Sequence, residues 1–144
     1  MSKTPIKILL VEDNEGDILL TTEALEECKV PNELHILRDG NEALFHLMTQ
    51  AKAGSKELPD LILLDVNLPK KNGHEVLESV KNHPDLKHIP IIMLTTSSSE
   101  TDILRAYQEH ANCYIIKPLE VSDFLHVTSK IEEFWLSIVR LPKN

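Results

Sequence analysis

Residues 61–65 read Leu-Ile-Leu-Leu-Asp, so that four consecutive apolar side chains are followed at once by a carboxylate. Four residues are too few for a helix, and a strand that is apolar on both faces is typical of the buried centre of a parallel sheet. Residues 91–94 repeat the pattern and are followed by Thr95, and residues 6–11, which are apolar except for Lys7, are followed by two acidic residues. These runs predict parallel strands with polar residues at their carboxyl ends.

Helical patterns alternate with these strands. After the first run, residues recur at intervals of three and four, as on one face of a helix: Ile18, Thr21, Leu25 and Cys28. A second helix is predicted to open at Gly40, with an inner stripe of Leu44, Leu47, Met48 and Ala51. A third has Val76, Leu77 and Val80 on its inner face, and two more helical patterns follow later in the chain.

Two further strands complete the alternation. Residues 34–37 are more polar than the other strands, as an edge strand would be, and residues 114–116 end at Lys117-Pro118. Alternating strands and helices predict an α/β fold, here a doubly wound, five-stranded parallel sheet with helices on both faces. We expect residues 1–144 to form this single domain, with no effector domain.

The composition fits a globular protein and excludes several classes. Of the 144 residues, 42% are apolar and 26% charged, and no apolar run is long enough to cross a bilayer. Because no signal peptide is recognisable, we expect a cytoplasmic protein, and Cys28 and Cys113 fit a reducing compartment. A net charge of −8 argues against binding to nucleic acid. The seven histidines are scattered and predict no zinc site.

The polar residues at the strand ends are Glu12, Asp13, Asp65, Thr95 and Lys117. Parallel strands bring their carboxyl ends to one edge of the sheet, which is where such folds bind ligands. Carboxylates that converge there repel one another unless a cation lies among them, and such oxygen ligands suit Mg²⁺. Each residue alone has an ordinary explanation, such as capping the next helix, but the ordered set predicts a functional site.

This ordered set resembles the receiver domain of two-component response regulators, and the resemblance covers nearly the whole chain. It implies the strand order 2-1-3-4-5 and a phosphorelay in which a histidine kinase phosphorylates Asp65. It also implies that Mg²⁺ or Mn²⁺ is held by Asp65, Asp13 and the backbone carbonyl of Asn67, with Glu12 in the outer sphere. Glu12 stands where many receivers have Asp, a change that keeps the charge.

The resemblance also implies which residues respond to the phosphoryl group. Lys117 pairs with this group in the family, Thr95 matches the switch hydroxyl, and Tyr114 matches the switch aromatic. Pro118 matches a proline that often follows a cis peptide bond. Such a protein is not an enzyme with other substrates, because it catalyses only its own phosphorylation and dephosphorylation, and it signals by changing conformation.

A narrower resemblance concerns the partner kinase. Residues 36–40, 67–73 and 134–142 are similar to the corresponding stretches of small single-domain regulators that partner cyanobacterial phytochromes. This likeness implies a phytochrome-type histidine kinase, and a histidine kinase of another type is the alternative.

Three other functions can be weighed against the receiver. A phosphatase of the haloacid dehalogenase type carries DxD at its nucleophile, whereas here the motif reads Asp65-Val66-Asn67 and the second carboxylate is missing. A flavodoxin-like cofactor binder needs a phosphate loop after its first strand, where this chain is acidic. A DNA-binding regulator needs an effector domain, and only a last helix and a short tail follow Pro118.

The apolar pattern of the last predicted helix, residues 121–139, predicts a homodimer. A core-facing stripe centred on Phe124 is enough to dock the helix, yet Val121, Leu125, Leu136 and Val139 project to one side of it. The resulting apolar arc covers about half of the circumference, wider than the stripe of roughly 100° that a docked helix needs. One self-complementary patch suffices for a two-fold interface. The alternative is that a curled tail covers this face within one monomer.

Overall fold

The computed structural model describes residues 5–27, 31–54, 58–95, 108 and 113–116 of the chain. Within these residues five parallel strands form one sheet in the order β2-β1-β3-β4-β5. Their bounds are β1 Ile6–Val11, β2 Asn32–Leu37, β3 Leu61–Asp65, β4 Ile91–Thr95 and β5 Cys113–Ile116. The predicted fold and strand order are confirmed.

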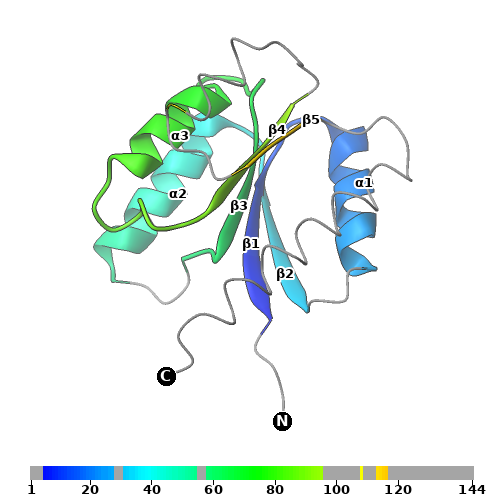
Figure 1. Cartoon of the computed structure of the whole chain (residues 1–144), viewed down its shortest axis with the longest axis horizontal. Coiled ribbons are helices and arrows are strands. Elements are labelled where there is room, and N and C mark those ends of the chain that lie inside the picture. Colours follow the sequence, from blue (N-terminus) through cyan, green and yellow to red (C-terminus); the bar gives the residue numbers. More distant parts are fainter. Residues whose placement is uncertain (1–4, 28–30, 55–57, 96–107, 109–112, 117–144) are drawn as a thin grey trace.

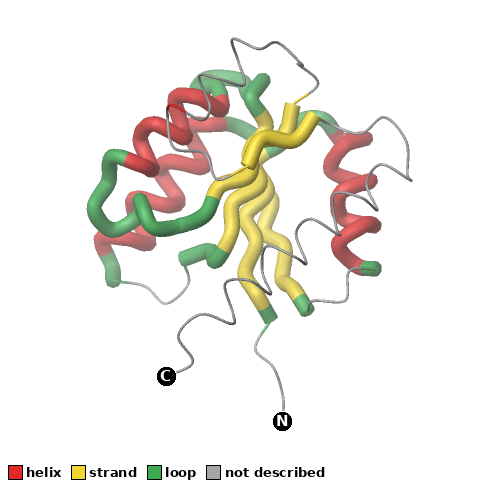
Figure 2. The backbone as a smooth tube through the Cα atoms, in the orientation of Figure 1, coloured by secondary structure: helices red, strands yellow, loops and turns green. Residues whose placement is uncertain are grey.

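Helices cover both faces of this sheet. The helix α1 (Glu15–Glu26) lies on one face, and α2 (Gly40–Lys52) and α3 (Gly73–Lys81) lie side by side on the other, as Figure 1 shows. The tube in Figure 2 makes the three layers visible, with the strands in the middle. The expected fourth and fifth helices fall outside the described residues.

The position of β3 at the centre of the sheet explains why its sequence is apolar on both faces. All five of its residues are buried, and alternate side chains enter two separate cores. Ile62 and Leu64 join the core under α2 and α3, whereas Leu61 and Leu63 join the core under α1. Burying four large aliphatic side chains stabilises the fold by roughly 1.5–3 kcal/mol each, so this strand anchors the sheet.

The edge strand β2 begins two residues before the predicted boundary of 34–37. It extends back to Asn32 because Asn32 pairs in register with Ile6 at the start of β1. Its side chains alternate between half-buried and exposed positions over most of its length, since successive side chains of a strand point to opposite faces of the sheet. Polar Asn32 and Glu33 are therefore tolerated inside the strand, and the hydrophobic pattern could not reveal them.

Each described helix begins with a side-chain cap. Asn14, Asp39 and Asn72 accept hydrogen bonds from backbone N–H groups three residues later, at 2.9, 2.8 and 3.0 Å. Such caps satisfy N–H groups that have no partner within the helix. The predicted inner faces are confirmed for the described helices, although Met48 is only partly buried and Cys28 lies outside the described residues.

The start of α2 is tied to the loop between β3 and α3. Gly40 donates its N–H to the carbonyl oxygen of Pro69 at 3.4 Å, and Lys71 donates to the same oxygen at 2.8 Å. Lys70, between Pro69 and Lys71, has a positive φ of 69°, and its Nζ lies 3.9 Å from the Asp39 carboxylate. A Cβ added to Gly40 would lie 2.0 Å from the Lys71 carbonyl oxygen. Only glycine allows this approach.

We therefore expect Gly40→Ala to lower the free energy of unfolding by about 1–3 kcal/mol, because the added methyl group forces two backbone segments apart. Gly16→Ala is the matched control in the first turn of α1, where the nearest neighbour of the added Cβ is Asn14 Oδ1 at 3.2 Å. Urea unfolding followed by circular dichroism measures both variants. Equal stability of the Gly40 variant and the wild type would contradict the close approach.

Candidate metal centre

Three carboxylates meet at the carboxyl ends of β1 and β3. Glu12, Asp13 and Asp65 each offer an oxygen, and these oxygens all lie within 4.8 Å of one another. Glu12 and Asp65 are almost fully buried, with 1% and 4% of their surface exposed, whereas Asp13 is exposed. The cluster therefore has two buried members and one side open to solvent, and the predicted convergence of these three residues is confirmed.

Glu12 is held by the turn that links β1 to α1. Its backbone N–H donates to the carbonyl oxygen of Leu37 at 3.0 Å, which continues the pairing of β1 with β2. Its side-chain Oε2 accepts the N–H of Asn14 at 3.2 Å, and Asn14 in turn caps α1. The cap and the carboxylate are thus fixed by the same turn.

Asp65 is the last residue of β3, and its backbone is fixed by the neighbouring strand and by α3. Its Cα is paired with Leu94, whose carbonyl oxygen accepts the N–H of Val66 at 3.2 Å. At the start of α3, Gly73 donates to the Val66 carbonyl oxygen at 2.8 Å. A Cβ at Gly73 would lie 2.3 Å from the Asp65 carbonyl oxygen. Gly73 therefore positions the backbone of Asp65, a role that the sequence alone did not predict.

Asn67 lies two residues after Asp65, exposed at the centre of a tight turn. The turn is closed by a hydrogen bond from the N–H of Leu68 to the carbonyl oxygen of Val66, at 3.2 Å. This position at the same edge of the sheet is compatible with the predicted use of the Asn67 carbonyl as a metal ligand. That use stays a prediction.

The remaining predicted residues are placed only in part. Thr95 ends β4 and is paired with Ile116, and Tyr114 lies in β5 opposite Met93, but their side chains are outside the described part of the structure. Thr95 follows directly on Leu94, the register partner of Asp65, so its backbone lies at the same sheet edge. The residues outside the described ranges are Lys117, Pro118, Val121, Leu125, Leu136 and Val139.

Charged groups flank the cluster at this edge. Arg38 Nε donates to Glu15 Oε2 at 2.9 Å, which joins the end of β2 to the start of α1. The hydrogen bond and the charge of Arg38 lower the pKa of the Glu15 carboxyl. The pKa of Asp39 is also lowered, chiefly by the backbone N–H of Glu42. Both carboxylates are therefore held in their charged form beside the cluster.

The donor set fits a hard divalent cation. Three carboxylates whose oxygens approach within 4.8 Å repel one another, and a bound cation would offset that repulsion. Mg²⁺ is usually held by one or two protein carboxylates, with water and phosphate oxygens in its other positions. Mn²⁺ accepts the same oxygen ligands. Asp13, Asp65 and the turn at Asn67 would hold such an ion, with Glu12 beside them.

The fold and the acidic cluster define a class of signalling protein. Residues 8–129 match the response regulator receiver domain family, and the chain belongs to this family. Proteins of this class transmit signals. Among the described residues, no helix has the length and apolar character needed to cross a membrane.

Two relatives within this family are similar to the chain over nearly its whole length. The chain is 46% identical over 141 residues to the response regulator Rcp1 of Synechocystis, covering 98% of this chain and 96% of Rcp1. It is 42% identical over 141 residues to the probable methanogenesis regulatory protein FilR2 of Methanothrix harundinacea, covering 98% and 90% of the two chains. The chain is thus homologous to a phytochrome response regulator.

Solved structures agree with the sequence relatives. The phosphorylated cyanobacterial phytochrome response regulator RcpA superposes with a TM-score of 0.85 at 48% identity, covering 97% of this chain and all of RcpA (100%). The Mn²⁺-bound form of Rcp1 superposes with a TM-score of 0.81 at 46% identity, covering 96% and 99% of the two chains.

We expect Asp13→Asn to raise the melting temperature by a few degrees when divalent ions are chelated, because it removes one of three repelling charges. The same change should weaken Mg²⁺ binding by about tenfold or more, since it removes a ligand. Thermal unfolding with EDTA and with increasing Mg²⁺ measures both effects. Asp85→Asn, an exposed change outside the cluster, is the control. If Mg²⁺ raised the melting temperature of the Asp13 variant as much as that of the wild type, Asp13 would not be a ligand of the ion.

Proposed function

We propose that this response regulator accepts a phosphoryl group on Asp65 from a histidine kinase and signals by a phosphorylation-dependent change of conformation. The convergence of Glu12, Asp13 and Asp65 within 4.8 Å is the observation that carries the proposal. Phosphoryl transfer needs chiefly positioning and neutralisation of charge, and this cluster supplies an acceptor carboxylate beside a site for a divalent ion.

The transfer forms one bond and breaks another. A carboxylate oxygen of Asp65 attacks phosphorus in line, the P–N bond to the kinase histidine breaks, and its electron pair stays on the imidazole nitrogen. Bound Mg²⁺ or Mn²⁺ supplies positive charge for the phosphoryl oxygens. Because the backbone of Asp65 is fixed by β4 and by Gly73, the attacking carboxylate keeps its place during the reaction.

Lys117, Thr95 and Tyr114 complete the proposed mechanism. Lys117 follows directly after β5 in the chain and would pair with the phosphoryl group. The Thr95 hydroxyl would donate a hydrogen bond to a phosphoryl oxygen of the acyl phosphate. Thr95 would move inward to make this hydrogen bond, and its movement would open space for the ring of Tyr114. A local change in charge would thereby shift the equilibrium between two conformations.

The partner that we propose is a phytochrome-type histidine kinase. Support comes from RcpA, described as a cyanobacterial phytochrome response regulator and 48% identical to this chain. The probable methanogenesis regulatory protein FilR2 is nearly as similar in sequence at 42% identity, so a histidine kinase of another type is the alternative. Phosphotransfer from a panel of purified kinases, with and without a phytochrome sensor, tests the choice directly.

We also propose that the chain forms a homodimer through its last helix. The support is the apolar arc predicted for residues 121–139: Val121, Leu125, Leu136 and Val139 extend it beyond the stripe centred on Phe124, so that it is wider than docking within one monomer requires. A two-fold contact buries such a patch against its own copy.

Acetyl phosphate with Mg²⁺ should add the mass of one phosphoryl group to the wild type and none to Asp65→Asn, because the amide oxygen is a poor nucleophile. Intact-mass spectrometry reads the result, and Asp85→Asn should be labelled like the wild type. Chelation of the metal should stop labelling, because Glu12, Asp13 and Asp65 would then repel the anion. Equal labelling of the Asp65 variant would refute the assignment.

Light scattering during chromatography at micromolar concentration should give twice the chain mass. Leu125→Asp or Val139→Asp should reduce it to the monomer mass, because the introduced charge would be buried at the contact. Leu19→Asp is the matched control, since Leu19 is an apolar residue of α1 that is 58% exposed. A monomer mass both before and after phosphorylation would exclude the dimer.

A further inference from the structure

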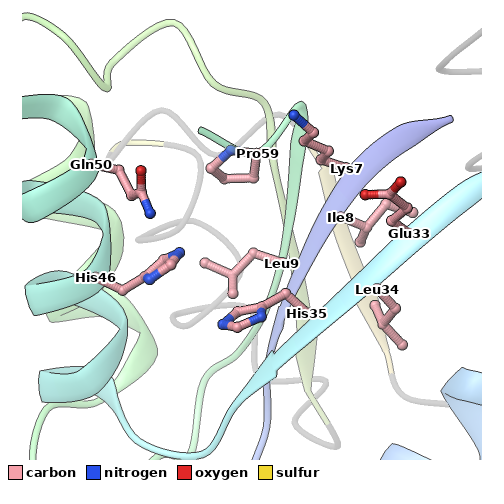
Figure 3. A pocket seen from close by; sticks show the side chains of 9 residues that line it. All are labelled: Lys7, Ile8, Leu9, Glu33, Leu34, His35, His46, Gln50 and Pro59. Carbon is pink, nitrogen blue, oxygen red and sulfur yellow. The ribbon is translucent and has the colours of Figure 1, made fainter. Parts of the chain in front are cut away.

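Two histidine rings stack at the edge of the sheet, in a part of the molecule that the proposed function does not use. His35 lies on β2 and His46 on α2, with ring centroids 4.9 Å apart and planes inclined by 20°. A pocket of about 340 Å³ opens beside them, and Leu9, Gln50 and Pro59 also line it (Figure 3). The sequence alone predicts no zinc site, but folding brings these two imidazoles together.

The pocket is separate from the acidic cluster. Its rim includes Lys7 and Glu33, which are paired in register near the amino ends of β1 and β2. Glu12 and Asp65 lie at the opposite, carboxyl ends of the strands. An ion in the pocket would therefore occupy a second site with different ligand chemistry.

We propose that His35 and His46 bind a divalent transition-metal ion of the Zn²⁺, Ni²⁺ or Cu²⁺ class in this pocket. Imidazole nitrogen is a preferred ligand of these ions and a poor one for Mg²⁺. Gln50 lies one helical turn after His46 and lines the same pocket (Figure 3). With its amide turned toward the ion, its oxygen and water would complete the coordination.

A shared ion requires one of the two stacked rings to turn. Metal–nitrogen bonds of about 2.0–2.1 Å place two ligating nitrogens roughly 3–4 Å apart. Two rings whose centroids lie 4.9 Å apart are near enough for a nitrogen of each to reach one ion. Nearly parallel rings do not yet aim both lone pairs at one point, so one imidazole has to turn about its Cβ–Cγ bond. His35 is exposed and has room to do so, and this torsion is soft.

The surroundings favour the neutral imidazole that a metal needs. Burial lowers the pKa of His46, and the neighbouring His35 lowers it further. His46 is therefore in the ligand form at neutral pH. Bound to both histidines, the ion would link the edge strand β2 to α2, and it would stabilise the folded state because the unfolded chain holds no such pair.

The test is calorimetric titration of the full chain with Zn²⁺ in the presence of excess Mg²⁺, which would occupy the acidic cluster. We expect one ion per chain, with an affinity at least tenfold weaker in His35→Ala and in His46→Ala. The control is His88→Ala, an exposed histidine outside the pocket, which should bind like the wild type. Melting temperatures with and without Zn²⁺ should show stabilisation of the wild type and of the control only.

Two results would overturn the proposal. One is the absence of Zn²⁺ binding by the wild type. The other is binding that neither His35→Ala nor His46→Ala weakens, which would place the ion on other residues. Circular dichroism of the metal-free variants should show that both are folded, so that a lost affinity reports on the ligands themselves.

Discussion

The repulsion among Glu12, Asp13 and Asp65 is the constraint on which the rest of the site depends. Their oxygens lie within 4.8 Å of one another, and two of the three side chains are buried, where charge is costly. Such an arrangement is stable when the strands hold it firmly and a cation offsets the charge. The apolar β3, buried along its whole length, supplies the first condition, and an ion such as Mg²⁺ or Mn²⁺ would supply the second.

The loops at this edge fix the positions of the carboxylates relative to the sheet. Asn14 both caps α1 and donates its N–H to Glu12, so the start of the helix and the position of the carboxylate depend on the same turn. Gly73 packs against the Asp65 carbonyl without a side chain, and this close approach seats α3 on the end of β3. Backbone contacts of this kind position an acceptor carboxylate more closely than a free loop could.

The sequence predicted the parts of the fold that have a strong local signal. The run at residues 61–65 predicted a buried strand because every side chain is apolar and the run is too short for a helix. The strand order came from the family resemblance, since periodicity does not say which strands are neighbours. The start of β2 at Asn32 was missed because polar residues in an edge strand leave no hydrophobic pattern. Gly73 and the His35–His46 pair were missed because both depend on contacts between segments far apart in the sequence.

The most direct test of the central claim is to locate the phosphoryl group itself. The chain is incubated with acetyl phosphate and Mg²⁺, the acyl phosphate is reduced with borohydride, and the modified residue is identified by tandem mass spectrometry. A single modification at Asp65, absent when the metal is chelated, is the predicted result. Modification at Asp13 or at another residue, or labelling that persists without a divalent ion, would contradict the role assigned to this cluster.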